Sequence, residues 1–118
     1  MGSNDLWSVR AINKDDDTLI PETLGASVFS LSPETAWKGV RIKLPLTDSR
    51  WKDWIAEAVS VFIHLVDGGK TREHWEIKVK SVYDIKVVGD NLIFSVEGNF
   101  KMMPSEGAGS DALDACSG

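Results

Sequence analysis

The chain has 118 residues with a single cysteine; 42% of its residues are hydrophobic, 26% are charged, and the formal net charge is −5. This size and composition are typical of one globular domain with its own hydrophobic core, and a lone cysteine excludes an internal disulfide. No apolar run approaches the roughly 20 residues of a membrane-spanning helix, and no signal-peptide pattern opens the chain. We therefore expect a cytoplasmic protein, with one domain at 1–101 and a flexible tail at 102–118.

The charges are unevenly distributed. Residues 1–37 contain 6 acidic and 2 basic side chains, residues 38–86 contain 7 acidic and 10 basic, and residues 87–118 contain 5 acidic and 1 basic. An acidic chain repels the phosphates of nucleic acids, which argues against a nucleic-acid ligand. Acidic segments can instead attract a basic protein.

The first part of the chain predicts three strands, at 6–12, 25–31 and 40–44. Apolar and polar residues alternate in these segments, and Pro45 ends the third because it has no amide proton to donate. Between the strands we expect a polar turn at 13–18, irregular structure at 19–24 around Pro21, and a single helical turn at 32–35.

One segment has the periodicity of a helix. An apolar stripe follows a possible N-cap at Thr47 or Asp48 and consists of Trp51, Trp54, Ile55 and Ala58. Residues 59–66 then alternate and are rich in β-branched side chains, which favours a strand there. A helix that continues to residue 66 is the competing interpretation.

The clearest pattern predicts a hairpin over residues 75–100. Apolar residues occupy odd positions up to Val87, and the phase reverses after the turn Gly89-Asp90. Pairing Val88 with Asn91 places one apolar set on a single buried face: Tyr83, Ile85, Val87, Leu92, Phe94 and Val96. Residues 73–80 are expected to pair also with 59–66, which sets His64 opposite Glu76.

These elements predict an α+β fold. It consists mostly of an antiparallel sheet of about six strands, forming a curled sheet or a partly open barrel, with one main helix against a face or an end. The helix after the third strand is similar to the element order of the oligonucleotide-binding barrel, although the acidic charge argues against the usual ligand of that barrel.

No residue set predicts catalysis, a cofactor or a metal. His64 beside Glu76 could act as a general base with its orienting acid, and His74 could join them as a metal ligand. A surface pair is the simpler interpretation, because no nucleophile accompanies them. Cys116 lies in the acidic tail, where nothing lowers the pKa of a thiol.

The chain therefore resembles a non-enzymatic protein-binding domain. Its small size and acidity are similar to those of bacterial toxin-neutralising proteins, and the most specific hypothesis is an immunity or antitoxin protein that occludes a basic toxin such as a nuclease. Carboxylates would mimic phosphates and Trp37 would serve as an aromatic anchor; the acidic residues are Asp15, Asp16, Asp17 and Glu22. The alternatives are a small-ligand or carbohydrate-binding β-domain and a structural component of a phage or secretion assembly.

Overall fold

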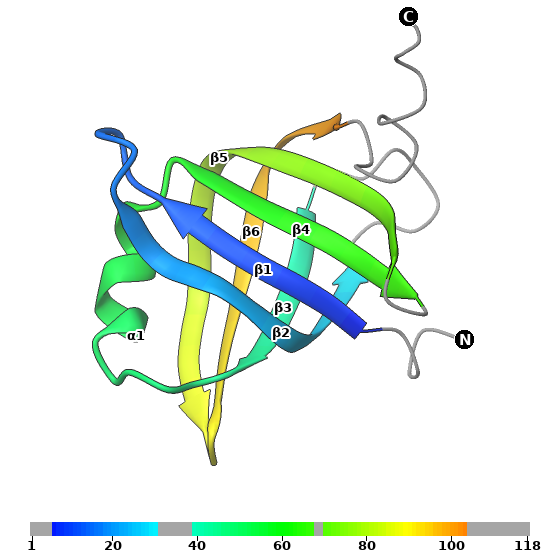
Figure 1. The fold of residues 1–118 in the computed structure, drawn as a ribbon. Helices are drawn as coiled ribbons and strands as arrows, with labels where there is room; N and C mark the ends of the chain where they lie inside the picture. The colour runs from blue at the N-terminus through cyan, green and yellow to red at the C-terminus, as the bar shows by residue number, and fades with distance from the viewer. Residues whose placement is uncertain (1–5, 31–38, 68–69, 104–118) are drawn as a thin grey trace, which may run out of the picture.

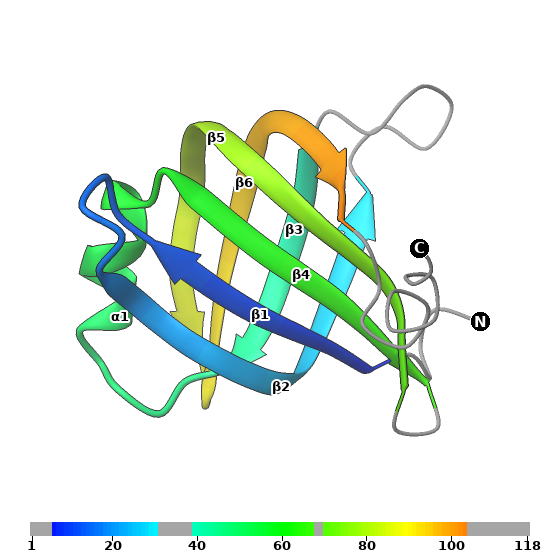
Figure 2. The ribbon, with the colours of Figure 1, turned by 45° about the horizontal axis from the view of Figure 1, so that its top comes forward.

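A computed structural model describes residues 6–30, 39–67 and 70–103, which form a six-stranded antiparallel barrel (Figures 1 and 2). The strands are β1 (Leu6–Ile12), β2 (Thr18–Ser30), β3 (Gly39–Pro45), β4 (Ser60–Asp67), β5 (Lys70–Val88) and β6 (Asn91–Met102). Between β3 and β4 lie a short helix, α1 (Trp51–Trp54), and a 3-10 turn, η2 (Ile55–Glu57). The predicted helical turn at 32–35, Trp37 and Cys116 fall outside the described residues.

The barrel is closed, which corrects the expectation of a curled sheet or a partly open barrel. The strand order around it is β1-β2-β3-β6-β5-β4. Closure comes from β1, which pairs with β4 over its whole length, from Leu6 opposite Val66 to Ile12 opposite Ser60. Each strand therefore pairs with a neighbour on both sides. An open sheet would leave backbone N–H and C=O groups unpaired along its two edge strands.

The second strand starts earlier than the sequence indicated. Residues 19–24 are part of β2 and are not irregular. Val9 pairs with Thr23 and Ala11 with Ile20, so Pro21 lies in a bulge where the ladder is already interrupted. A second shift places Gly25 between paired residues with a φ of 99°, a conformation that glycine adopts without strain.

The hairpin of β5 and β6 follows the predicted register only near its tip. Val88 pairs with Asn91 and Val87 with Leu92, but a shift between Tyr83 and Lys86 then places Tyr83 opposite Ser95 instead of Val96. A second shift follows between Val79 and Ser81. Leu92, Phe94 and Val96 are fully buried as expected, while Ile85 is only partly buried. Tyr83 and Val87 are 36% and 41% exposed, so their predicted burial is wrong.

The helical segment closes one end of the barrel (Figure 1). Trp51, Ile55 and Ala58 are buried, Trp54 packs against the core, and Lys52 is exposed, as the apolar stripe predicted. The helix ends before Ala58 and β4 follows at Ser60, which confirms the strand interpretation of the next segment.

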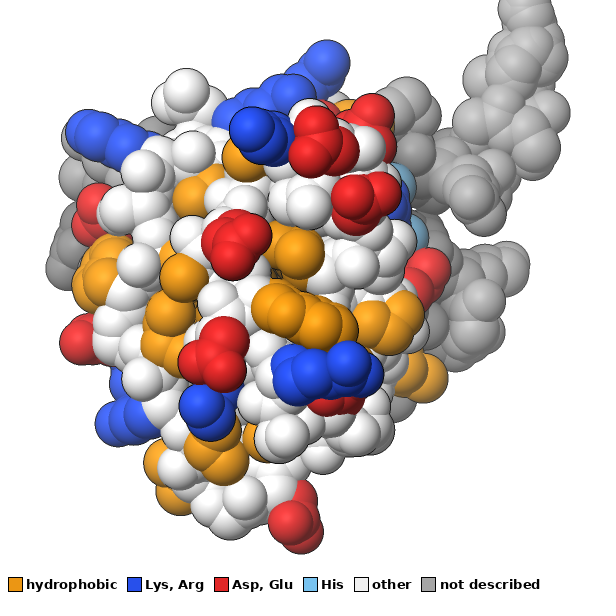
Figure 3. Space-filling view, turned by 90° about the vertical axis from the view of Figure 1, so that its left-hand side faces the viewer, with side chains coloured by type: hydrophobic (Ala, Val, Ile, Leu, Met, Phe, Trp, Pro, Cys, Tyr) orange, Lys and Arg blue, Asp and Glu red, His pale blue; other side chains and the backbone are white. Residues whose placement is uncertain are grey.

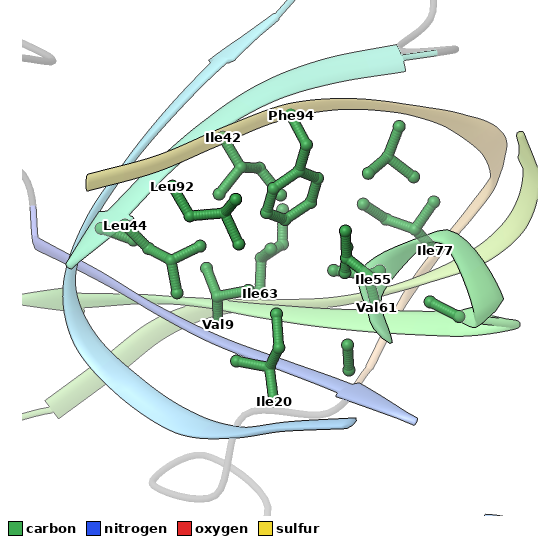
Figure 4. Close-up of a cluster of buried hydrophobic side chains, with 14 of the residues drawn as sticks. Val9, Ile20, Ile42, Leu44, Ile55, Val61, Ile63, Ile77, Leu92 and Phe94 are labelled. Atoms are coloured by element: carbon green, nitrogen blue, oxygen red, sulfur yellow. The ribbon is translucent and has the colours of Figure 1, made fainter. Parts of the chain in front are cut away.

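The interior of the barrel is filled mainly by aliphatic side chains around Phe94 (Figure 4), and the buried cluster also includes Trp7 and Trp51. All six strands contribute, and Ile55 from η2 points into the same cluster. Because this core is packed with side chains, any contact of the described residues with another molecule falls on the outer surface of the barrel.

Candidate functional site

The predicted acidic residues Asp15, Asp16 and Asp17 occupy the turn between β1 and β2, at the barrel end that carries α1 (Figure 1). The Asn13 side chain organises the turn: its Oδ1 accepts hydrogen bonds from the amides of Asp15 (2.9 Å) and Asp17 (3.0 Å). All three aspartates are exposed, and none of their carboxylates forms an ion pair with a described residue. The result is a fixed backbone turn that presents carboxylates to solvent.

This barrel end also carries an exposed apolar side chain. The Val59 amide donates a hydrogen bond of 2.9 Å to the carbonyl of Ile12, the residue just before the turn segment. Val59 is 40% exposed. Hydrophobic, acidic and basic side chains are interspersed over this end of the molecule (Figure 3).

Glu22 does not belong to the acidic turn. It follows Asp17 by five residues, or about 16 Å of extended chain, and lies on the outer side of β2. There its Oε2 accepts a hydrogen bond of 3.0 Å from the Ser8 hydroxyl and lies 3.7 Å from Nδ1 of His64. The structure therefore separates Glu22 from the three aspartates, and Trp37 lies outside the described residues.

The two histidines face each other directly. His64 pairs with His74 across β4 and β5, not with Glu76 as predicted, and their ring centroids are 3.8 Å apart. Glu76 is instead buried, accepts a hydrogen bond from the Ser60 hydroxyl (3.1 Å) and pairs with Lys78 (3.2 Å). The predicted cross-strand pair of His64 with Glu76 is therefore wrong.

The serine, glutamate and histidine near this point do not have the order of a nucleophilic triad. In a triad the imidazole lies between the hydroxyl and the acid, so that it can accept the hydroxyl proton. Here Glu22 lies between Ser8 and His64, and the Ser8 hydroxyl already donates to the carboxylate. Ser8 is also only 3% exposed, which keeps a substrate from its oxygen.

A second surface lies on the side of the barrel opposite β1. The sequence did not predict it as a site. We call it the β3–β6 face, and it consists of side chains on four neighbouring strands: Phe29, Arg41, Lys43, Tyr83, Lys86, Ile93 and Ser95, of which Ser95 is itself buried. One row across the strands runs from Phe29 through Arg41 and Ser95 to Tyr83, and the next includes Lys43, Ile93 and Lys86. The alternation of Arg41 and Lys43 in β3 was the sequence signal for this face.

Arg41 is held in the middle of this face. Its Nη1 donates a hydrogen bond of 2.9 Å to Oγ of Ser95 and lies 3.9 Å from Oδ2 of Asp84. Asp84 has a φ of 54° within the bulge between Tyr83 and Lys86, a conformation that is rare outside glycine, asparagine and aspartate. The bulge thus positions a carboxylate beside the arginine.

Tyr83 is oriented by Glu97, whose Oε2 accepts its hydroxyl hydrogen bond at 3.1 Å. Partial burial raises the pKa of Tyr83 above its ordinary value, and the hydrogen bond to the Glu97 carboxylate raises it further. The phenol therefore remains a protonated hydrogen-bond donor at neutral pH.

Among residues 6–30, 39–67 and 70–103, no three histidine, cysteine or acidic side chains are grouped to hold a metal ion. No helix in the same part of the chain is long and apolar enough to cross a membrane. Comparisons with protein-family models, curated proteins and solved structures found no match to this chain.

Proposed function

We propose that this chain is a non-enzymatic protein-binding domain, and that its most specific form is an immunity or antitoxin protein that occludes a basic toxin in the cytoplasm. The observation that carries the proposal is the turn of Asp15, Asp16 and Asp17. Its backbone is organised by Asn13, and its carboxylates have no cationic partner among the described residues.

A preorganised acidic turn suits the recognition of lysine and arginine side chains. Because the turn is already held by hydrogen bonds, little conformational entropy is lost when a partner binds. The carboxylates would steer a basic protein toward this end of the barrel, and exposed Val59 beside the turn would add apolar contact. Glu22, which is already engaged by Ser8 and His64, has a smaller part in this proposal than the sequence suggested.

The test is a quantitative affinity capture from the source cells with three baits. The first is the unchanged chain, and the second carries Asp15→Asn, Asp16→Asn and Asp17→Asn. The third is a matched control that keeps the turn and removes three other exposed carboxylates, two on α1 and η2 and one in the β5–β6 turn, through Asp53→Asn, Glu57→Gln and Asp90→Asn.

We expect a basic protein that the unchanged chain and the control capture equally and that the acidic-turn variant captures poorly. The activity of that purified protein should then fall when the unchanged chain is added. A captured partner that all three baits retain equally would contradict a role for the turn. Absence of any specific partner would contradict the protein-binding proposal itself.

A further inference from the structure

The β3–β6 face differs in chemistry from the rest of this acidic chain. It carries three cations, Arg41, Lys43 and Lys86, and two nearby carboxylates, Asp84 and Glu97. Both carboxylates are already engaged, Asp84 with Arg41 and Glu97 with the Tyr83 hydroxyl. Lys43 and Lys86 are exposed and form no ion pair with a described residue. The cations that remain available therefore favour an anionic partner.

The same face exposes apolar surface next to those cations. Phe29 is 54% exposed and Tyr83 is 36% exposed, and they occupy the two ends of the row that contains Arg41. Ile93 lies in the next row between the two lysines. Aromatic residues and arginine are the residues most enriched at the energetic centres of protein interfaces.

We propose that the β3–β6 face binds an acidic segment of a partner protein that also carries apolar side chains. From Phe29 to Tyr83 the row crosses three strand intervals, about 14 Å, which is the length of about four extended residues. A carboxylate of the segment pairs with Arg41, others meet Lys43 and Lys86, and apolar side chains contact the two aromatic rings.

Asp84 gives this proposal a distinctive consequence. Its carboxylate lies 3.9 Å from the Arg41 guanidinium and is largely exposed, so it competes with an incoming carboxylate for the same cation and repels it. Removing this charge should strengthen binding of an acidic segment.

A protein segment fits this face better than a nucleic acid does. A nucleic-acid strand presents phosphates continuously and is bound by an unbroken track of cations. Here Asp84 and Glu97 interrupt the cations, and the whole chain has a charge of −5. A peptide can place a carboxylate at Arg41 and neutral side chains beside Glu97.

The experiment measures fluorescence anisotropy with three labelled probes and the full chain. The first probe is a short peptide of alternating aspartate and phenylalanine, the second is its counterpart with asparagine in place of aspartate, and the third is oligothymidine. The variants are Arg41→Gln, Asp84→Asn and the control Arg10→Gln. Arg10 stacks on Phe62 at 4.2 Å and lies on β1, across the barrel from β6.

We expect saturable binding of the acidic peptide that is weakened about tenfold by Arg41→Gln, the value for one lost charge-assisted hydrogen bond. Asp84→Asn should strengthen binding of the acidic peptide about two- to fivefold, because it removes the exposed ion pair that competes for Arg41. Arg10→Gln should leave binding unchanged. Asparagine tolerates the positive φ of position 84, and thermal melting verifies that each variant is folded.

Three results would overturn the proposal: no saturable binding of the acidic peptide, equal losses for Arg41→Gln and Arg10→Gln, or binding of oligothymidine in preference to the peptide. The last result would assign the face to single-stranded nucleic acid. None of these results bears on the acidic turn, which lies at the barrel end and is tested with different variants.

Discussion

Gly98 on β6 lies directly against the backbone of Lys78 on β5, so that a Cβ at position 98 would overlap the Lys78 carbonyl oxygen. The carbonyl carbon of Lys78 would be 2.9 Å away and the amide nitrogen of Lys80 3.0 Å away. This contact lies at the shift between Val79 and Ser81, where the long β5 strand bends around the barrel. Only a residue without a side chain fits there.

Gly98→Ala is therefore expected to destabilise the fold by about 2 kcal/mol or more, because backbone atoms cannot move aside as a flexible side chain can. Urea denaturation followed by tryptophan fluorescence measures this change. Asn99→Ala, at the neighbouring exposed position, is the control and should change the free energy of unfolding by less than about 0.5 kcal/mol.

The end of β5 next to the Gly89-Asp90 turn makes a second prediction about the core. Phe94 is fully buried, and Phe94→Ala should cost about 3–5 kcal/mol of stability. Val87 is 41% exposed, although simple alternation places it in the core, and Val87→Ala should cost about 1 kcal/mol or less. Similar large losses at both positions, measured by chemical denaturation, would mean that Val87 is buried in the core with Phe94.

The helical segment should contribute stability through the side chains that close the barrel. Ile55 is fully buried in the core cluster, so Ile55→Ala is expected to cost about 2–5 kcal/mol. Lys52→Ala, on the exposed side of α1, should change stability by less than about 0.5 kcal/mol. If thermal unfolding showed equal effects, the segment would not be a structural cap.

Asp48 predicts a dependence of stability on pH. Two hydrogen bonds from the Arg50 side chain, to Oδ1 (3.0 Å) and Oδ2 (2.8 Å), lower the pKa of Asp48 from 3.8 to about 2. A pKa lowered in the folded state stabilises the fold above the unfolded value and loses that contribution as pH falls through the folded value. The advantage of the unchanged chain over Asp48→Asn should therefore shrink between pH 3.8 and about 2.

Melting temperatures of both proteins across that range measure the effect. Because Asp48 and Arg50 meet solvent, added salt should reduce the difference between the two proteins. A difference that stays constant from pH 5 to pH 2 would mean that the ion pair does not form in solution.

The acidic turn makes a kinetic prediction for the partner identified by affinity capture. Asp15→Asn, Asp16→Asn and Asp17→Asn together should slow association and reduce its dependence on ionic strength, because steering charges act mainly on the on-rate. Stability should barely change, since Asn13 continues to hold the backbone of the turn. Surface plasmon resonance at two salt concentrations measures the rates; an unchanged on-rate would place the interface elsewhere.

Local patterns in the sequence correctly predicted the elements that depend on neighbouring residues. The first strand, the third strand and the Gly89-Asp90 turn occur where alternation and turn residues indicated. Trp51 and Ile55 are buried as predicted, since residues four positions apart lie on the same face of a helix. The position of the acidic turn followed from the same kind of local information.

The bulges could not be predicted from one strand alone. Pro21 indicated that no regular strand runs through residues 19–24. In the fold, β1 pairs with β2 on both sides of Pro21, so the irregularity is a bulge within β2. Tyr83 and Val87 follow the apolar alternation, yet the extra residues of β5 move Tyr83 opposite Ser95 and out of the core. A bulge depends on the relative lengths of two paired strands, which alternation within one strand does not contain.

The sequence by itself determined the strand-rich class, the apolar face of each regular strand and the exposed acidic turn, because side-chain direction follows from backbone periodicity. Only the tertiary structure decided which side chains meet. It placed Glu22 beside Ser8 and His64, and Arg41 against Ser95, 54 residues further along the chain. The physical reason is that closure of the barrel must pair the backbone groups at the strand edges and pack the core at the same time. These two requirements together set which distant strands pair.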